Sequence, residues 1–144
     1  MTPRYSNSYI DQQLDDDDYD SLVEISRLIC GARSFTTDTA DYGLPCPGFL
    51  IVETLTWFAQ SIRSSVWTYF EATPEARQRQ MCLALEQFGP QGFADAYSKG
   101  MTSWRDMTRA QDLDIWAELQ DDRANTWLHD LARQHRELII ELVA

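Results

Sequence analysis

The chain has 144 residues, enough for one folded domain, and its 23 Asp and Glu against 12 Lys and Arg give a formal net charge of −11. Because 44% of the residues are hydrophobic, the charge predicts an acidic folded surface rather than a disordered chain. Such a surface repels nucleic acid and anionic membranes and attracts basic partners, so the composition disfavours direct nucleic-acid binding and membrane binding.

The first 18 residues are predicted to form an acidic flexible arm. They are polar and end in the four consecutive aspartates Asp15–Asp18, which repel one another and lack helical periodicity. Residues 1–10 contain no apolar signal segment, and the chain has no run of about 18 apolar residues. We therefore expect a soluble, cytoplasmic protein, with residues 19–144 forming a single helical domain.

The first helix of this domain is predicted to begin at Asp20 or Ser21, with Glu24 completing a capping box. Gly31 follows the last apolar residue and indicates the end of the helix. Four apolar residues share one face of it: Leu22, Ile25, Leu28 and Ile29. Residues 33–48 contain Thr, Asp, Gly and Pro without a repeat and are predicted to be a loop.

Helical spacing continues through the middle of the chain. A hydrophobic stripe from Ile51 to Ile62 predicts a helix, and residues 66–70 predict a short one after it. Thr73 and Pro74 are typical of an N-cap followed by the first helical position, and Gly89 indicates where that helix ends. The next helix is indicated by aromatic and apolar residues at intervals of four and three: Phe93, Tyr97, Met101 and Trp104.

Two further helices are predicted at the C-terminal end. Residues 106–122 form a short acidic helix, and a stripe with alternating intervals of four and three follows it: Ala124, Leu128, Leu131, His135, Leu138 and Leu142. The stripe packs either in the core of the chain or in an oligomer interface, and both readings stay open. No alternating β-branched run indicates a strand, so the predicted fold is all-α, a single-domain helical bundle of about five to six helices.

No group of residues has the pattern of a catalytic, cofactor or metal site. His129 and His135 lie six apart, on nearly opposite sides of a helix, so they cannot bind one metal ion together. His135 is expected on the apolar stripe and His129 on the surface. The three cysteines, at 30, 46 and 82, are widely spaced, and the acidic stretches lack the glycine-bearing loop of a calcium site. We therefore expect a binding protein without metal or cofactor rather than an enzyme.

Residues 53–101 show an order of features seen in one bacterial family. Phe58-Ala59-Gln60 is followed by the aromatic stretch Val66-Trp67-Thr68-Tyr69-Phe70, by a helix opened with Pro74-Glu75 and closed at Gly89, and by Phe93-Ala94-Asp95-Ala96-Tyr97. This order resembles the acidic all-helical DNA-mimic family, formerly a domain of unknown function. The Asn-Gly-Gly of that family is Arg63-Ser64-Ser65 here. The resemblance implies a helical bundle, a homodimer, and an acidic face that occupies a DNA-binding protein or neutralises a toxin.

The charge and the resemblance lead to one main hypothesis: a small acidic protein that neutralises a basic protein partner, by toxin immunity or by DNA mimicry. The alternative is an assembly module that acts through an apolar helical interface, with the acidity serving only solubility. The candidate partner-binding residues form an acidic helix row, the N-terminal aspartates and two tryptophans: Asp112, Asp114, Glu118, Asp121 and Asp122; Asp15, Asp16, Asp17 and Asp18; Trp67 and Trp104.

Overall fold

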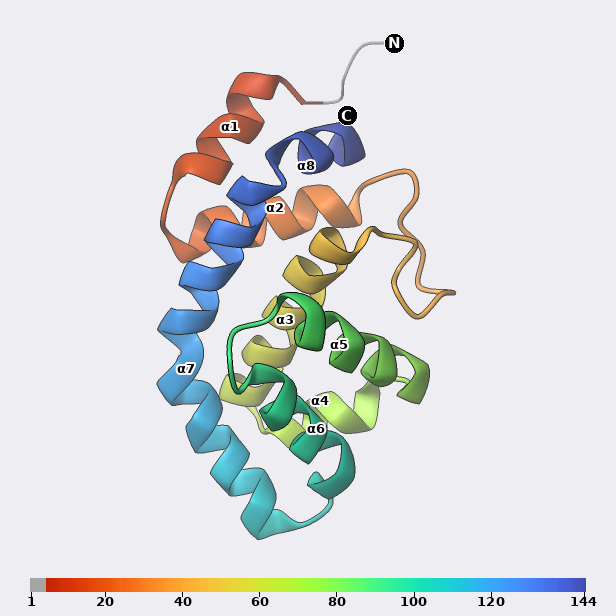
Figure 1. The fold of residues 1–144 in the computed structure, drawn as a ribbon, viewed down its shortest axis with the longest axis vertical. Helices are drawn as coiled ribbons and strands as arrows, with labels where there is room; N and C mark the ends of the chain where they lie inside the picture. Colours follow the sequence, from red (N-terminus) through yellow and green to blue (C-terminus); the bar gives the residue numbers. More distant parts are fainter. Residues whose placement is uncertain (1–4) are drawn as a thin grey trace. The chain divides into compact units, whose positions relative to one another are not determined.

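The computed structural model describes residues 5–144, and within this range the chain forms eight helices and no strand (Figure 1). The prediction of an all-α fold is confirmed, while the number of helices exceeds the expected five to six. The helices are α1 (Asn7–Asp15), α2 (Tyr19–Cys30), α3 (Cys46–Arg63), α4 (Val66–Ala72), α5 (Glu75–Phe88), α6 (Phe93–Ser103), α7 (Met107–Gln134) and α8 (Arg136–Val143).

The chain divides into two compact units. One contains the residues up to Val52 together with Asn125–Ala144, and the other contains Glu53–Ala124. We call them the terminal unit and the central unit. Helices α3 and α7 each contribute residues to both. The expectation of a single domain over residues 19–144 is therefore not confirmed. No helix among residues 5–144 combines the length and the apolar character that crossing a membrane requires.

The terminal unit begins with a helix that the sequence prediction missed. Residues 7–15, expected as part of an extended arm, form α1, and residues 1–4 lie outside the described residues. The Ser6 side chain accepts a hydrogen bond from the Tyr9 backbone N–H, which caps the helix. Ile10 and Leu14 lie four residues apart and are both buried, and α1 contacts α2 and α8. One cap and two well-spaced apolar residues are enough to fix this short helix.

Helix α2 has the buried face that its sequence predicts, but it begins earlier. Its N-cap is Asp18, whose side chain accepts from the Ser21 backbone N–H at 2.8 Å, so the predicted caps Asp20 and Ser21 are wrong. Gly31 ends the helix as expected. The last of the four consecutive aspartates therefore belongs to a helix terminus and not to a free arm.

The C-terminal stripe is divided between two helices. Helix α7 is one continuous helix of 28 residues, where the sequence predicts a break near residue 123, and it ends before His135. His135 has φ −114° and ψ 31° and starts α8. Leu128 and Leu131 are 0% and 3% exposed, so the part of the stripe that lies on α7 is core.

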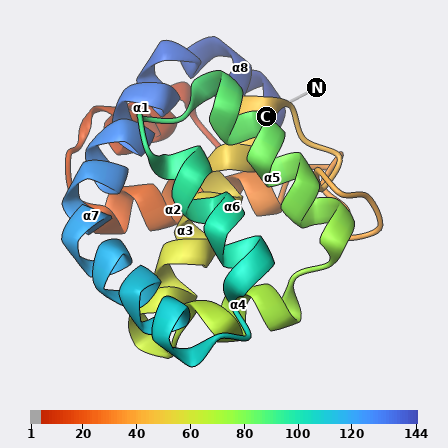
Figure 2. The ribbon, with the colours of Figure 1, turned by 60° about the horizontal axis from the view of Figure 1, so that its bottom comes forward.

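The central unit is built around aromatic side chains from α3, α4, α6 and the N-terminal half of α7. Figure 2 shows the ribbon of these helices. The Trp57 ring lies 5.0 Å from the Tyr97 ring and 5.6 Å from the Trp116 ring, measured between centroids. Tyr69 is fully buried, and its hydroxyl donates to Glu53 at 3.0 Å. These contacts bury large aromatic rings and provide a hydrogen bond to a buried carboxylate. They hold the N-terminal half of α7 in place within the central unit.

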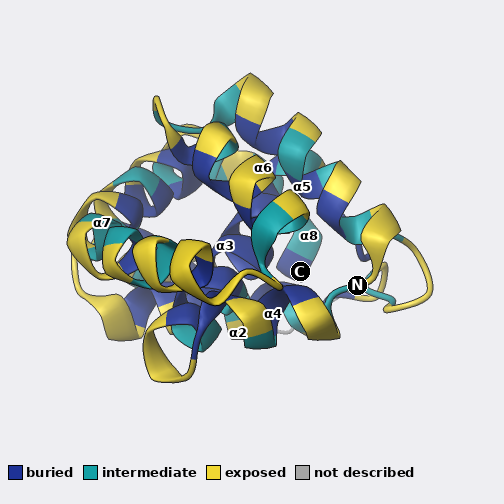
Figure 3. Cartoon of the chain, turned by 90° about the horizontal axis from the view of Figure 1, so that it is seen from below, coloured by how far each residue is buried: buried dark blue, intermediate teal, exposed yellow. Residues whose placement is uncertain are grey.

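Helix α7 turns alanines inward within the central unit. Ala110 and Ala117 lie seven residues apart and are 4% and 1% exposed. Figure 3 shows buried and exposed residues alternating along the helices, as amphipathic segments require. Because small residues occupy the buried side of α7, several of its larger apolar side chains remain on the outer side.

Candidate protein-interaction site

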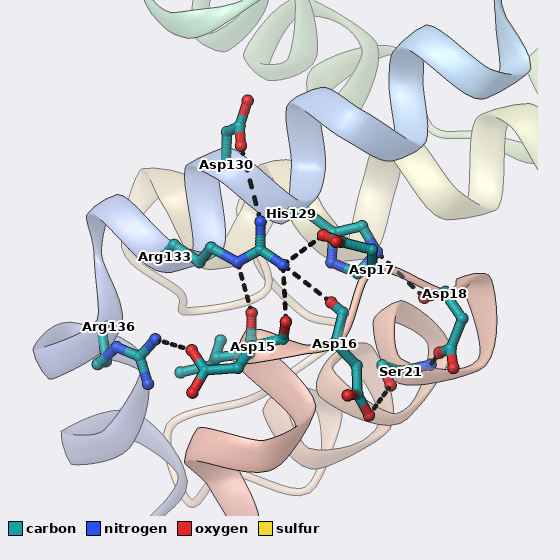
Figure 4. Close-up of polar contacts among 10 residues, drawn as sticks. Asp15, Asp16, Asp17, Asp18, Ser21, His129, Asp130, Arg133 and Arg136 are labelled. Carbon is teal, nitrogen blue, oxygen red and sulfur yellow. Dashed lines mark hydrogen bonds and ion pairs between the residues drawn. The ribbon is translucent and has the colours of Figure 1, made fainter.

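Three of the N-terminal aspartates, Asp15–Asp17, lie close to Arg133 from the C-terminal part of α7, while Asp18 lies beside Ser21 and His129 (Figure 4). Arg133 Nε donates to the Leu14 carbonyl at 2.8 Å, and one terminal nitrogen donates to the carbonyls of Asp15 and Asp16 at 3.1 and 3.0 Å. The same nitrogen donates to the Asp17 carboxylate at 2.5 Å. Arg133 thus satisfies the carbonyls at the C-terminal end of α1 and neutralises one aspartate.

The other three aspartates also have internal partners. Asp15 forms an ion pair with Arg136, and Asp16 accepts from the Ser21 hydroxyl at 3.2 Å. The hydrogen bond from Arg133 lowers the pKa of Asp17, and the backbone N–H of Ser21 lowers the pKa of Asp18. Asp15–Asp18 therefore support the fold of the terminal unit. Their predicted role as a flexible binding segment is not supported by this geometry.

His129 is placed differently from the sequence prediction. It was expected on the surface, but it is only 3% exposed, and its Nε2 lies 3.0 Å from the Asp18 carbonyl oxygen. Its Nδ1 is buried without a hydrogen-bond partner. His135, expected on the apolar stripe, is half-buried at the start of α8. The buried histidine helps to hold the loop between α1 and α2 in place.

The acidic residues on α7 form a contrasting group in the central unit. Asp112, Glu118 and Asp122 are exposed, and Asp121 is half-buried. Burial, together with the neighbouring Asp122, raises the pKa of Asp121. None of these four carboxylates forms an ion pair with another residue in the range 5–144. We call these four residues the α7 acidic face. At about 100° of rotation per residue, Asp112, Glu118 and Asp122 lie within an arc of about 120°, and Asp121 lies outside this arc, about 180° from Asp112.

Asp114, which the sequence analysis placed in the same row, has a different environment. Its carboxylate accepts from the Val66 backbone N–H at 2.7 Å and from the Ser65 hydroxyl at 3.0 Å. Val66 is the first residue of α4, so Asp114 satisfies a backbone donor at that helix terminus. Its charge is used within the central unit, and the predicted row of five carboxylates is reduced to four.

The two candidate tryptophans line the same hollow, whose volume is about 600 Å³. Trp67, on α4, is 47% exposed, and Trp104 follows the end of α6. The Arg105 guanidinium lies 4.2 Å from the centre of the Trp104 ring. Met107, at the start of α7, also lines the hollow and is 75% exposed. This volume lies within the range of about 300–1,000 Å³ that is usual for ligand pockets.

A second hollow, of about 560 Å³, lies between α6 and α7. Its lining has mixed charge, because Lys99 and Arg109 face it together with Asp95 and Asp112. Among the described residues, Trp116 is the one aromatic residue that lines it, whereas Trp67 and Trp104 both line the first hollow. We therefore place the candidate interaction site at the tryptophan hollow and the α7 acidic face.

No group of three or more His, Cys, Asp or Glu side chains among residues 5–144 is arranged to hold a metal ion. The cysteines at 30, 46 and 82 are free, and burial raises the pKa of each thiol. Comparisons with protein-family models, curated proteins and solved structures find no match. The resemblance to the DNA-mimic family therefore remains a prediction.

Sequence reasoning missed two groups of residues at these sites. Arg133 and Arg136 neutralise aspartates more than 110 positions earlier in the chain, and nothing local in the sequence signals such a pairing. Nothing in the sequence indicates that Met107 is exposed, because its exposure depends on where α7 begins. Ile115 and Leu119 do have a readable signal: they lie four residues apart, while the alanines of α7 occupy another face.

Proposed function

We propose that this protein is a small acidic binding protein that neutralises a basic protein partner through the α7 acidic face. The observation that carries the proposal is that Asp112, Glu118, Asp121 and Asp122 form no ion pair with any other residue in the range 5–144. The four N-terminal aspartates, by contrast, all have partners within the chain. Unpaired carboxylates on a rigid helix are available to a cationic partner without breaking any contact of the fold.

Two physical effects favour such a partner. The acidic surface raises the rate of encounter with a positively charged protein, and Arg or Lys side chains relieve the like-charge repulsion between neighbouring carboxylates. Asp121 and Asp122 are adjacent, and the raised pKa of Asp121 reflects part of that repulsion. A basic partner therefore gains the most binding free energy at Asp121 and Asp122, where the carboxylates of the α7 acidic face are adjacent in the sequence.

The spacing of the charges favours neutralisation of a toxin over close imitation of DNA. Asp112 and Asp122 are separated by about 15 Å along the helix, at a rise of about 1.5 Å per residue. Duplex DNA carries about nine negative charges over that length. The α7 acidic face carries four carboxylates, so it matches a cluster of basic side chains more closely than a phosphate backbone.

The alternative, an assembly module acting through the C-terminal stripe, receives less support. Leu128 and Leu131 are buried within the chain and present no free surface. The half-buried Leu138 and Leu142 lie on the separate helix α8. A homodimer that uses the whole stripe would require these core residues to leave their present contacts.

Fluorescence anisotropy with a labelled arginine–serine peptide tests the proposal. The first variant neutralises the α7 acidic face: Asp112→Asn, Glu118→Gln, Asp121→Asn and Asp122→Asn. The control variant removes the same number of charges at exposed positions elsewhere: Asp38→Asn, Glu86→Gln, Glu137→Gln and Glu141→Gln. Both remove four negative charges from the net charge of −11, so they differ only in location.

We expect the first variant to bind the peptide at least about fivefold more weakly than the control variant, with the difference shrinking at high salt. The two variants share the same net charge, so this result would assign the binding to a local surface. Equal loss of affinity in both would contradict the proposal, because binding would then follow net charge alone.

A further inference from the structure

The outer side of α7 carries a line of side chains spaced by four residues. Met107, Ile115 and Leu119 are 75%, 57% and 75% exposed, and the exposed Gln111 completes the line. Side chains four residues apart form the ridges by which helices pack against one another. The line, which we call the α7 ridge, lies entirely in the central unit and extends over about 18 Å.

Acidic side chains lie on both sides of the α7 ridge. At about 100° of rotation per residue, Asp112 lies about 60° from Ile115 in one direction and Glu118 about 60° in the other. Neither forms an ion pair within residues 5–144. An apolar ridge between two unpaired carboxylates is complementary to an apolar stripe that has basic residues on both edges.

The geometry points to one kind of occupant: an amphipathic helix of the partner protein, with Lys or Arg flanking its apolar stripe. This inference rests on the proposed function and specifies the structure of the basic partner. The apolar stripe packs on Ile115 and Leu119, while the flanking cations pair with Asp112 and Glu118. A second copy of this chain is a poorer occupant, because it brings the same carboxylates against each other.

The tryptophan hollow provides the end of this docking surface. Met107 belongs to the α7 ridge and also lines the hollow with Trp67 and Trp104. A large side chain at one end of the partner helix therefore enters the hollow, while the following turns lie along Ile115 and Leu119. Anchor residues that fill a well-packed pocket carry most of the binding energy of a protein interface.

The test uses two synthetic peptides of about 18 residues, long enough to span the α7 ridge as a helix. One carries leucines at helical spacing of three and four with lysines on both edges, and the other has the same composition with the leucines scrambled. The protein variants are Ile115→Gln with Leu119→Gln, and the control Leu83→Gln. Leu83 is 62% exposed on α5, so its replacement removes one exposed apolar side chain away from the ridge.

We expect the amphipathic peptide to bind at least about tenfold more tightly than the scrambled peptide and to become helical on binding. The double ridge variant should lose this preference, and Leu83→Gln should keep it. Equal affinity for both peptides would overturn the inference. In that case the proposed function still stands if both peptides bind the variant with the neutralised α7 acidic face more weakly than they bind the charge control variant.

Sedimentation of the protein alone completes the test. A concentration-dependent dimer that is lost in the Ile115→Gln, Leu119→Gln variant would overturn the inference, because the α7 ridge would then be a self-association surface. A monomer in both the wild-type protein and the variant, together with peptide discrimination, supports a separate partner helix.

Discussion

The two acidic segments of this chain differ in what their charges do. In the terminal unit, Asp15 and Asp17 pair with Arg136 and Arg133, Asp16 and Asp18 accept from Ser21, and together they hold the junction between α1 and α2. In the central unit, no carboxylate of the α7 acidic face forms an ion pair with another residue in the range 5–144. The denser run of aspartates is thus the one used by the fold, and the more dispersed group is available to a partner.

The comparison shows that charge density along a sequence does not measure the charge that a surface presents. Four adjacent aspartates repel one another in an extended chain, yet a single guanidinium can bind the backbone carbonyls and a carboxylate of that segment together. Pairing depends on the fold, which brings residue 133 to residue 17.

The largest expected effect is on the stability of the terminal unit. Arg133→Ala removes the hydrogen bonds to the Leu14, Asp15 and Asp16 carbonyls and the ion pair with Asp17. Because hydrogen bonds to a charged donor contribute strongly, the variant should lose ~2–3 kcal/mol of unfolding free energy. Urea denaturation measures the loss.

The matched control is Arg123→Ala, in the central unit. Arg123 is exposed, and its guanidinium lies 5.6 Å from the centre of the Phe93 ring. Its loss should cost less than about 1 kcal/mol. If Arg133→Ala and Arg123→Ala lost the same unfolding free energy, the contacts of Arg133 with the N-terminal aspartates would add no particular stability. The distinction between the paired and the unpaired acidic segments would then be lost.

A smaller loss of unfolding free energy is expected when Asp114, on α7 itself, is replaced. Asp114→Ala leaves the Val66 backbone N–H and the Ser65 hydroxyl without their carboxylate acceptor. The expected cost is ~1–2 kcal/mol, the usual range for a lost helix cap. Thermal unfolding of this variant beside Asp112→Ala measures the difference. A neutral Asp114→Ala would place this residue back in the free row that the sequence predicts.

The pH dependence of stability should follow the paired segment. The folded-state pKa values of Asp17 and Asp18 are lowered from 3.8, so their contribution is present above about pH 4 and is lost as the pH falls through the lowered values. Asp121 has the opposite sign, because its raised pKa means that protonation relieves a cost in the folded state. Asp17 and Asp18 therefore lower the stability of the fold as the pH becomes acidic, whereas Asp121 does not.

Urea denaturation of Asp17→Asn, Asp18→Asn checks this sign. The double variant should be less stable than the wild-type protein at about pH 6, and the difference should shrink as the pH falls from about 4 through the lowered pKa values of Asp17 and Asp18. A constant difference across this range would show that the two ionised carboxylates do not contribute.

The smallest expected effect on stability belongs to the α7 acidic face. Neutralising Asp112, Glu118, Asp121 and Asp122 together should change the unfolding free energy by less than about 1 kcal/mol, because exposed charges contribute little. A small gain is expected from relief of the repulsion between Asp121 and Asp122. Differential scanning calorimetry measures it, and a large loss would show that these residues have structural partners.

Local sequence patterns predict much of the fold and little of the pairing. The buried face of α2 and the ends at Gly31 and Gly89 follow from apolar spacing and from the preference of glycine for helix ends. Helix α1 was missed because its apolar face consists of only Ile10 and Leu14, in a segment dominated by charge.

The candidate site was only partly predictable for the same reason. Trp67 and Trp104 were singled out as large aromatic residues, but only the fold brings them to one hollow. Asp114 is indistinguishable from Asp112 in the sequence, and its role depends on the position of α4. The exposure of Ile115 and Leu119 follows from the alanines on the opposite side of α7, which is a pattern that sequence alone contains.

An NMR titration tests the central claim most directly, by recording amide shifts of the ¹⁵N-labelled protein as the lysine-edged amphipathic peptide is added. The account predicts that the largest shifts fall at residues 107–122 and at the indole N–H groups of Trp67 and Trp104. Residues 15–18 should change little, because their carboxylates are already paired within the chain. Largest shifts at Asp15–Asp18, with none on α7, would contradict the account.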